Sequence, residues 1–316
     1  MDEKGHSWEE KLCGNSTRLG VGVIGDSAGA HFSIPEKFFN VSIMGNGTFD
    51  DLLPRVADEL DLPQESAYTA HTNTSYPSHS VYKHLRKWNL CNNNDFQNLG
   101  VNGGDSDNTQ GNIKALSRNQ DHDHPMLMFL ELVGNDVCTR GQIISSQKFK
   151  ANILKLLSYL DTRLPKGSHL VILGLADGDL LFKYLTGSTH PLEITYDQMY
   201  DFLNCLQISP CPGWLNTNAT VREETTKAAK RLSKVYQEII DEGIHFANFD
   251  MQYYDFPTEQ MFERMYLENK APTDMIERCD GFHPSGLFHS YLADWLWLQI
   301  GTQHPEWIGP ENPHNA

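Results

Sequence analysis

The sequence predicts an α/β domain with three layers, in which helices cover both faces of a central parallel sheet. Short, continuous apolar runs recur along the chain, as expected for strands that are buried on both faces. Segments with apolar residues at helical spacing separate these runs. Most of the runs also end in Gly, Asn or Asp, which favour turns.

Five segments are predicted to be strands of the sheet. In chain order they are Gly20–Ile24, Phe96–Val101, Met126–Val133, His169–Leu175 and Ile244–Phe249. The spacing of apolar residues also predicts helices. These are Phe149–Leu160, Glu223–Glu242 and Leu287–Ile300, and the tail from Gly301 is expected to lie along the surface.

The chain of 316 residues has the length and apolar content of a single domain, covering residues 1–316. Two stretches without a convincing core strand, residues 33–90 and 180–220, are predicted to be insertions. They are either loops and surface helices or a cap that binds substrate. The longest apolar stretches are far shorter than the roughly 20 residues of a membrane span, so no transmembrane segment is expected.

The chain is acidic: it has 25 Lys and Arg against 41 Asp and Glu, a net charge of −16. Without a basic cluster, this charge argues against binding to nucleic acid. The negative net charge also opposes binding of an anionic substrate. This repulsion weakens at acidic pH, because protonation of all 14 histidines would change the net charge to −16 + 14 = −2. We therefore expect association with an anionic lipid to strengthen as the pH falls towards ~5.

Polar or glycine-containing sequences follow several of the predicted strands. They are Gly25-Asp26-Ser27, Asn102-Gly103, Gly134-Asn135-Asp136 and Asp177-Gly178. Ligands of open α/β sheets bind beyond the carboxyl ends of the strands. These sequences therefore predict one crevice at that edge of the sheet.

Ser27 is the predicted nucleophile, because it follows a strand and precedes small residues that suit a tight turn. A serine needs a base, and the base needs an acid that orients it. The spacing of Asp280 and His283 lets the carboxylate reach one imidazole nitrogen and leaves the other for Ser27. The backbone N–H groups of Ser27 and Gly103 and the amide of Asn135 are the predicted donors to an oxyanion.

The string Gly25-Asp26-Ser27-Ala28-Gly29 also fits the G-x-S-x-G motif of α/β-hydrolases. In that fold several strands precede the serine, whereas only 26 residues precede Ser27 here. A late Asp-x-x-His also differs from the widely separated acid and histidine of that fold. The motif is therefore not interpreted as that of an α/β-hydrolase.

These residues resemble the motif blocks of the SGNH (GDSL-type) hydrolases. The blocks correspond to Gly25-Asp26-Ser27, Gly103, Val133-Gly134-Asn135-Asp136 and Asp280-Gly281-Phe282-His283. Ala28 stands where the family has Leu, and Val133 where the third block has its first Gly. The resemblance implies a flavodoxin-like fold and hydrolysis of esters through an acyl-serine.

Longer strings resemble the branch of this family that removes secondary, ester-linked acyl chains from the lipid A of lipopolysaccharide. They are Gly25–Phe32, Gly134–Cys138, Phe202–Cys211 and Asp280–Pro284. This resemblance implies a secreted or lysosomal glycoprotein. Its members carry a saposin-like domain and a calcium-binding segment before the catalytic domain, and neither is recognised here. Calcium is assigned to no residue, and the chemistry requires no cofactor.

Two other functions stay open. The chain could be a broader SGNH lipase or esterase that acts on phospholipids, acylglycerols or acetylated sugars. Alternatively, it could be a lipid- or glycan-binding protein that retains an inactive scaffold. The filled catalytic positions argue against the second alternative.

The six cysteines form no CxxC motif, and Cys205 and Cys211, on either side of a proline-containing turn, are the predicted disulfide pair. The run Asp121–His124 is predicted to be a solvated loop, so no metal ligand is assigned. Sequons favour secretion, although Met1-Asp2-Glu3-Lys4 opens no signal peptide. The sequons begin at Asn15, Asn40, Asn46, Asn73 and Asn218.

Overall fold

A computed structural model gives the fold and describes residues 5, 7–14, 16–72, 78–139 and 141–315. Its centre is a five-stranded parallel sheet with the strand order β2-β1-β3-β4-β5. The strands are β1 (Gly20–Gly25), β2 (Phe96–Gly100), β3 (Met126–Glu131), β4 (Ser168–Leu173) and β5 (Phe249–Tyr254). The predicted parallel sheet is confirmed.

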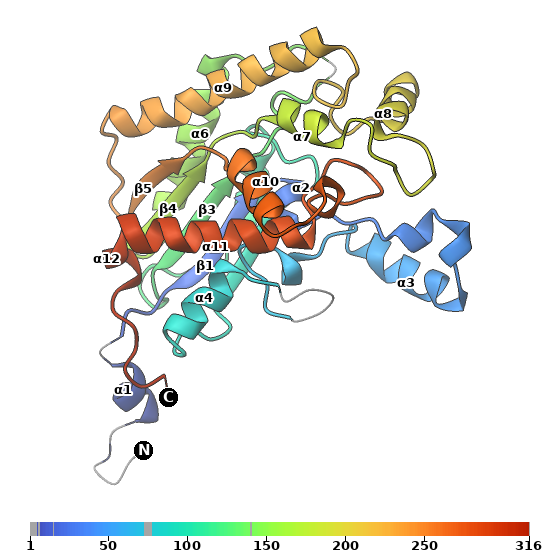
Figure 1. Ribbon diagram of the computed structural model, residues 1–316. Helices are drawn as coiled ribbons and strands as arrows, with labels where there is room; N and C mark the ends of the chain where they lie inside the picture. Colours follow the sequence, from blue (N-terminus) through green and yellow to red (C-terminus); the bar gives the residue numbers. More distant parts are fainter. Residues whose placement is uncertain (1–4, 6, 15, 73–77, 140, 316) are drawn as a thin grey trace.

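Helices cover both faces of the sheet, which confirms the three-layer prediction (Figure 1). Helices α6 and α9 pack together on one face, and α4 and α11 pack together on the other. The α-helices are α1 (Trp8–Cys13), α2 (Ser27–Ala30), α3 (Asn46–Ala57), α4 (Val81–Trp88), α5 (Thr109–Asn112), α6 (Ser146–Asp161), α7 (Gly178–Leu185), α8 (Tyr196–Cys205), α9 (Ala219–Asp241), α10 (Thr258–Leu267), α11 (Gly286–Gln303) and α12 (Pro305–Ile308). The short 3₁₀ helices are η1 (Glu36–Phe38), η2 (Val41–Ile43), η3 (Pro63–Glu65), η4 (Ile113–Ala115) and η5 (Pro272–Asp274).

The inner strands match the apolar runs of the sequence. Every residue of β1 and β3 is buried, and so is all of β4 except His169. The expectation of a strand at Ile244–Phe249 is wrong, because β5 starts only at Phe249. This strand lies at the edge of the sheet and mixes buried with exposed residues, so it lacks the continuous apolar run of an inner strand.

Two of the predicted helices lie within α6 and α11, which extend a few residues further at both ends. The third corresponds to α9, which begins four residues before the predicted start and ends at Asp241, one residue before the predicted end. Polar N-caps explain where they begin. The side chains of Ser145, Asn218 and Ser285 accept hydrogen bonds from backbone N–H groups of the first turns of these helices. The tail does not only lie along the surface, because Trp307 and Ile308 of α12 are buried.

The stretch 33–90 has two parts that differ in packing. Its first part includes α3, which projects from the side of the molecule where the strands end (Figure 1). The apolar side chains of Phe49, Leu53 and Val56 on this helix are exposed. Its second part includes α4, whose residues Val81, Tyr82 and Leu85 belong to the core. The stretch 180–220 contains most of α7, all of α8 and a loop with the buried Trp214.

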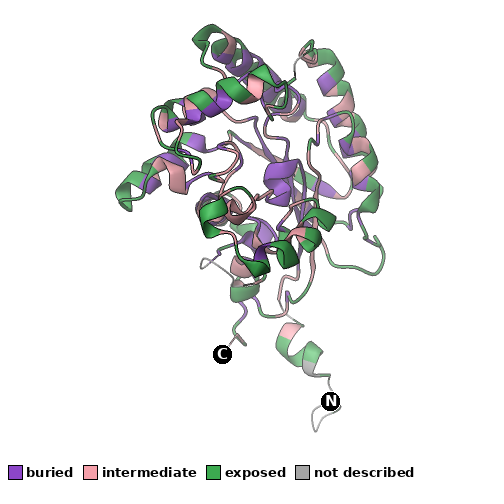
Figure 2. Cartoon of the chain, turned by 90° about the vertical axis from the view of Figure 1, so that its right-hand side faces the viewer, coloured by how far each residue is buried: buried purple, intermediate pink, exposed green. Residues whose placement is uncertain are grey.

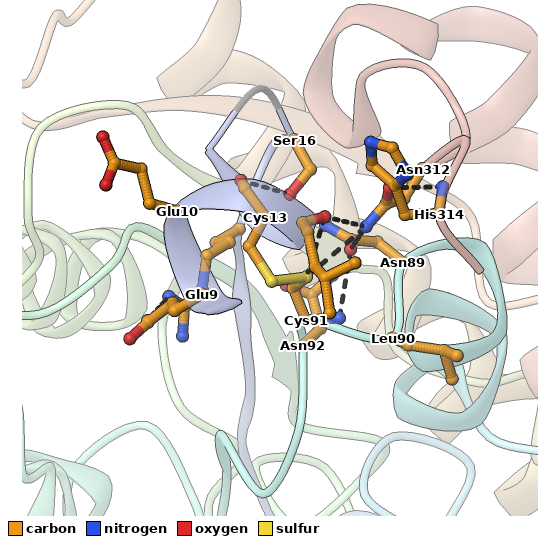
Figure 3. The surroundings of a disulfide bond; sticks show 12 residues. Glu9, Glu10, Cys13, Ser16, Asn89, Leu90, Cys91, Asn92, Asn312 and His314 are labelled. Carbon is orange, nitrogen blue, oxygen red and sulfur yellow. Dashed lines mark hydrogen bonds and ion pairs between the residues drawn. A yellow bond between two sulfur atoms is a disulfide. The ribbon is translucent and has the colours of Figure 1, made fainter. Parts of the chain in front are cut away.

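Two disulfides link segments that are distant in sequence. Cys13 is bonded to Cys91, and Asn312 near the C-terminus donates hydrogen bonds to Leu12 O (3.1 Å) and Asn89 Oδ1 (2.9 Å) beside this bond (Figure 3). The second disulfide joins Cys138 to Cys211. The predicted pair Cys205–Cys211 is therefore wrong: Cys205 is exposed at the end of α8, whereas Cys211 is buried against the segment after β3.

Buried residues gather in the sheet and on the inner sides of the helices, and exposed residues lie on their outer sides (Figure 2). In the described part of the chain, no helix is long and apolar enough to cross a membrane. Sequons Asn46 and Asn218 are exposed, and Asn40 is half-buried; Asn15 and Asn73 lie outside the described residues.

Candidate active site

Ser27 lies directly beyond the carboxyl end of β1, as the first residue of α2. Asp26 caps this short helix, because its Oδ1 accepts a hydrogen bond from Ala28 N at 2.9 Å. Its Oδ2 accepts from Val133 N at 2.8 Å, which joins the serine turn to the segment after β3. Burial raises the pKa of Asp26 to about 6, although these N–H groups favour the ionised form.

The loop between η5 and α11 carries the predicted base and acid. It closes on itself through a bridge between Ile276 and Pro284 and a hydrogen bond from Glu277 N to His283 O (2.8 Å). Asp280 Oδ1 accepts from Phe282 N at 2.8 Å and from His283 N at 3.0 Å. These bonds fix the carboxylate beside the imidazole.

The structure brings Ser27, His283 and Asp280 into one line of hydrogen bonds. Ser27 Oγ lies 2.8 Å from His283 Nε2, and His283 Nδ1 lies 2.7 Å from Asp280 Oδ2. Both Ser27 and His283 are buried. Burial alone would lower the pKa of His283, but the Asp280 carboxylate outweighs it, so this pKa lies above its usual value.

The predicted oxyanion donors differ in whether they line the cavity beside Ser27. Asn135 lines the same cavity as Ser27, and its Nδ2 donates to Gly104 O at 3.0 Å and to Asp26 Oδ2 at 3.3 Å. Gly103 is exposed and has a φ of +71°, a conformation that favours glycine. Gly104, which the sequence analysis did not single out, is buried next to Asp26, where an added Cβ would lie 2.9 Å from Gly25 O.

A cavity opens beside Ser27 and His283. Of the predicted strand-end sequences, Asp26-Ser27, Gly134-Asn135 and Asp177-Gly178 line it, whereas Asn102 and Gly103 are not among its lining residues. The rest of the lining is mostly apolar. It includes Leu181, Trp214, Phe256, Phe262, Met275, Ile276, Phe282 and Phe288.

Trp214 reaches the cavity from the stretch 180–220 because two glycines leave room for its ring. A Cβ at Gly178 would lie 2.2 Å from the ring, and one at Gly134 would lie 2.6 Å from it. The indole Nε1 donates to Thr226 Oγ1 at 3.0 Å. The Cys138–Cys211 disulfide anchors the loop that carries Trp214, so the cavity wall is covalently tied to the segment after β3.

Helix α8 supports the loop of Asp280 and His283, which sequence reasoning missed. Tyr200 Oη donates to Gly281 O at 2.6 Å, and Tyr196 Oη donates to Arg278 O at 2.9 Å. Gly281 has a φ of +62°, and a Cβ there would lie 2.6 Å from the Tyr196 ring. In the sequence, both tyrosines look like ordinary apolar residues of an amphipathic helix, so the spacing of α8 gave no sign of this contact.

The run Asp121–His124, which was predicted to be a solvated loop, is exposed. Its backbone and side chains make local turn contacts, such as Asn119 N to Asp123 Oδ2 at 2.7 Å. Within the described ranges, these residues form no group that could hold a metal ion.

A family model described as GDSL-like Lipase/Acylhydrolase matches residues 21–296, from β1 to the middle of α11. The chain belongs to this family of ester hydrolases. The match extends across the serine turn, the segment after β3 and the loop of Asp280 and His283, and so includes the whole of the site described above.

Curated relatives of the chain bear the name acyloxyacyl hydrolase. The protein of Oryctolagus cuniculus is 39% identical over 98% of this chain, and that of Mus musculus is 37% identical over 99% of it. The protein of Homo sapiens is 36% identical over 98% of this chain. In each case the chain spans 56% of the relative's length, so it corresponds to about half of those proteins.

A solved structure is also similar to the chain. Its title is "The active site of a carbohydrate esterase displays divergent catalytic and non-catalytic binding functions". The two sequences are 11% identical and the TM-score is 0.45. The similarity covers 93% of this chain and 72% of the chain in that structure.

Proposed function

We propose that this chain is a serine esterase that removes ester-linked secondary acyl chains from the lipid A of lipopolysaccharide. The observation that carries the proposal is the contact of Ser27 Oγ with His283 Nε2 at 2.8 Å, at the mouth of a cavity lined by apolar side chains. A nucleophile beside an apolar cavity suits an ester with a long acyl chain. The name of the curated relatives supports the acyloxyacyl linkage.

The reaction proceeds in two steps. His283 Nε2 takes the proton of Ser27 Oγ as the oxygen attacks the acyl carbonyl, and Asp280 stabilises the resulting imidazolium. The imidazolium then protonates the departing alkoxide oxygen of the lipid, which leaves as a hydroxyl while the acyl group stays on Ser27. In the second step, His283 takes a proton from water, the hydroxide attacks the acyl-serine, and the fatty acid leaves as the proton returns to Ser27.

The oxyanion of each step is stabilised by N–H donors around Ser27. The Ser27 N–H lies at the start of α2, where no acceptor within the helix is available to it. Asn135 Nδ2 donates to Gly104 O and Asp26 Oδ2 in the free enzyme, so one of these bonds gives way to the oxyanion. The Gly103 N–H is the third proposed donor, from the turn after β2.

Exposed apolar side chains support a lipid that is presented in an aggregate. They lie on or beside α3, which projects where the strands end (Figure 1). These residues are Phe39, Val41, Ile43, Phe49, Leu53 and Val56. On this basis the first part of the stretch 33–90 and the stretch 180–220 act as a cap: the first meets the lipid surface, and the second supplies Leu181 and Trp214 to the cavity.

The proposal includes the compartment and the partner of the enzyme. Two disulfides and exposed sequons at Asn46 and Asn218 support a secreted or lysosomal glycoprotein. A saposin-like subunit from a longer precursor would deliver the lipid. Ser27, His283 and Asp280 supply the nucleophile, the base and the acid, so the proposed chemistry requires no cofactor, and calcium is assigned to no residue.

The proposal is tested by comparing fatty-acid release from lipopolysaccharide, phospholipids, acylglycerols and acetylated sugars. We expect the highest kcat/KM on the acyloxyacyl esters of lipopolysaccharide. Equal or faster release from phospholipids would instead favour the broader lipase function. Failure of the protein to react with a serine-directed fluorophosphonate would show that the scaffold is inactive.

A further inference from the structure

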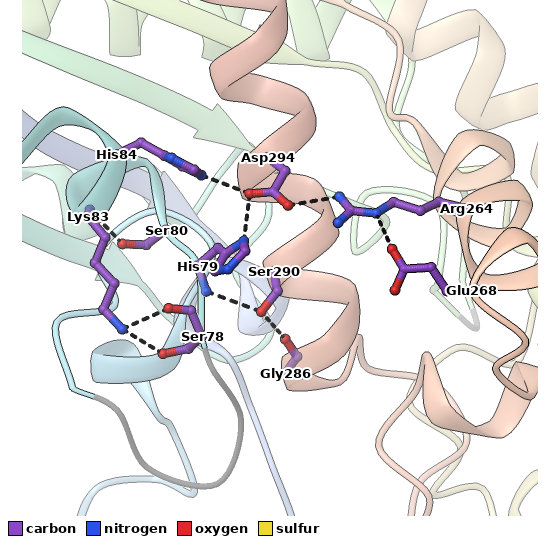
Figure 4. A network of polar contacts seen from close by, with 10 residues as sticks. All are labelled: Ser78, His79, Ser80, Lys83, His84, Arg264, Glu268, Gly286, Ser290 and Asp294. Carbon is purple, nitrogen blue, oxygen red and sulfur yellow. Dashed lines mark hydrogen bonds and ion pairs between the residues drawn. The ribbon is translucent and has the colours of Figure 1, made fainter. Parts of the chain in front are cut away.

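A cluster of His79, His84 and Asp294 lies outside the cavity of Ser27 and His283. His79 precedes α4, His84 lies on α4, and Asp294 lies on α11, more than 200 residues later (Figure 4). His79 Nδ1 lies 2.7 Å from Asp294 Oδ1, and His84 Nε2 lies 2.8 Å from the same oxygen. The proposed esterase mechanism uses none of these residues.

The three side chains converge on one point. One nitrogen of each imidazole and one oxygen of the carboxylate all lie within 4.8 Å of one another. Two imidazoles and a carboxylate are ligands typical of Zn²⁺, which takes three protein ligands and a water when the fourth position is open. His79 is half-exposed, with a side-chain exposure of 48%, so the cluster is open to solvent on one side.

Neighbouring residues hold two of these side chains in place. Arg264 Nη1 donates to Asp294 Oδ2 at 2.9 Å, which leaves Oδ1 for the imidazoles, and Glu268 Oε1 accepts from Arg264 Nε at 2.9 Å. The His84 ring stacks on Trp297 with a centroid distance of 5.5 Å. Such contacts orient metal ligands in known sites.

The charges beside the cluster also suit a cation, because the carboxylates of Asp294 and Glu268 outnumber the one guanidinium of Arg264. Glu268 offsets the charge of Arg264, which would otherwise oppose a cation nearby.

We propose that His79 Nδ1, His84 Nε2 and Asp294 Oδ1 bind a divalent transition-metal ion of the Zn²⁺ class. A tetrahedral ion about 2.0–2.1 Å from each ligand requires ligand atoms roughly 3.3 Å apart, so the two nitrogens move away from Oδ1 by about half an ångström. Each neutral imidazole then carries its proton on its other nitrogen. The ion replaces the two N–H···O bonds and links the segment before α4 to α11.

This link has a structural consequence. Helix α11 follows the loop of His283, and its Ser290 Oγ already accepts a hydrogen bond from His79 N at 3.3 Å. An ion that binds the folded state more tightly than the unfolded chain stabilises the fold. The ion is therefore structural, and it takes no part in the attack by Ser27.

The test is a titration of the tag-free, chelator-treated protein with Zn²⁺, followed by calorimetry and thermal unfolding. We expect one equivalent to bind and to raise the Tm. Co²⁺ should give the visible absorption of a tetrahedral site, and Ca²⁺ should not compete. In His79→Ala and His84→Ala, Zn²⁺ should bind at least 10-fold more weakly.

His122→Ala is the matched control, because His122 is an exposed histidine away from the cluster, and it should bind Zn²⁺ like the unmodified protein. If loss of the Trp297 contact prevents the His84→Ala protein from folding, the Zn²⁺ affinity of the His79→Ala protein tests the proposal by itself. His79 is half-exposed, so its substitution should leave the fold intact. Absence of a one-equivalent site, or equal Zn²⁺ affinity in the His79→Ala protein, would overturn the proposal. The cluster would then be an ion-pair network only.

Discussion

The hydroxyl of Tyr200 donates a hydrogen bond to the carbonyl oxygen of Gly281 at 2.6 Å. Gly281 lies between Asp280 and His283, so the loop of the acid and the base rests on α8, a helix of the stretch 180–220. A segment that looked like an insertion in the sequence thus touches both the cavity, through Trp214, and the loop that carries the base.

Removing this hydroxyl should weaken the positioning of His283. We expect Tyr200→Phe to lower kcat by roughly 10-fold with little change in KM, and to cost about 1 kcal/mol of unfolding free energy. Steady-state kinetics and the rate of fluorophosphonate labelling measure the first effect, and denaturant unfolding measures the second. Tyr266→Phe is the control, because Tyr266 is exposed on α10. A Tyr200→Phe enzyme with normal kcat would show that the contact only stabilises the fold.

The pair of Asp280 and His283 predicts a specific pH dependence. His283 must be neutral to act as a base, and the Asp280 carboxylate raises its pKa above the usual value of about 6.5. The kcat/KM of the unmodified enzyme should therefore fall as the pH decreases through this raised pKa. Asp280→Asn should lower kcat by roughly 10⁴-fold and move the acid limb of the profile to lower pH, because the imidazolium loses its partner. An unmoved limb in the variant would contradict the assignment of this pKa to His283.

Asn135 should matter for the transition state more than for binding. Its Nδ2 is the side-chain donor next to Ser27, so Asn135→Ala should reduce kcat by roughly 10²–10³-fold with a small change in KM. Thermal unfolding of the same protein shows whether the loss of its bonds to Gly104 and Asp26 has disturbed the fold. A Tm close to that of the unmodified protein together with full activity would remove Asn135 from the oxyanion site.

The space around Trp214 should set the preferred acyl-chain length. Gly178→Ala places a Cβ 2.2 Å from the present position of the Trp214 ring, so the ring must shift, and long chains should lose kcat/KM relative to short ones. Trp214→Phe should raise the kcat/KM of long chains relative to short ones, because the smaller ring leaves more space in the cavity. A series of acyl esters of increasing chain length measures both changes.

Gly111→Ala is the control for these variants. Gly111 is exposed, has an ordinary φ and leaves open space for a Cβ. Identical chain-length profiles in all of these variants would rule out Trp214 as a determinant.

The inner part of the fold could be predicted from the sequence because its strands are buried on both faces. The apolar runs of β1, β3 and β4 stand out for this reason. Strand β5 could not be placed in the same way, because it mixes buried with exposed residues and so lacks a continuous apolar run. The spacing of Asp280 and His283 was informative because both lie in one short loop and contact each other directly.

Contacts between segments that are distant in the chain could not be predicted from the sequence. Cys211 pairs with Cys138 rather than with the nearby Cys205 because the buried loop of Trp214 packs against the segment after β3. Similarly, the cluster of His79, His84 and Asp294 forms only when α4 and α11 pack together. Sequence spacing carries no information on such pairs, because packing of whole helices and loops brings them together.

The most direct test of the proposed function is to trap the acyl-enzyme. The protein is mixed with lipopolysaccharide, quenched in acid and digested, and the peptide that contains Ser27 is examined by mass spectrometry. We predict a fatty-acyl ester on Ser27 in the unmodified enzyme, no adduct in Ser27→Ala, and a fall in fatty-acid release of roughly 10⁴-fold or more in that variant. Release of fatty acid by Ser27→Ala at the normal rate, or an acyl group on a different residue, would contradict the proposed function.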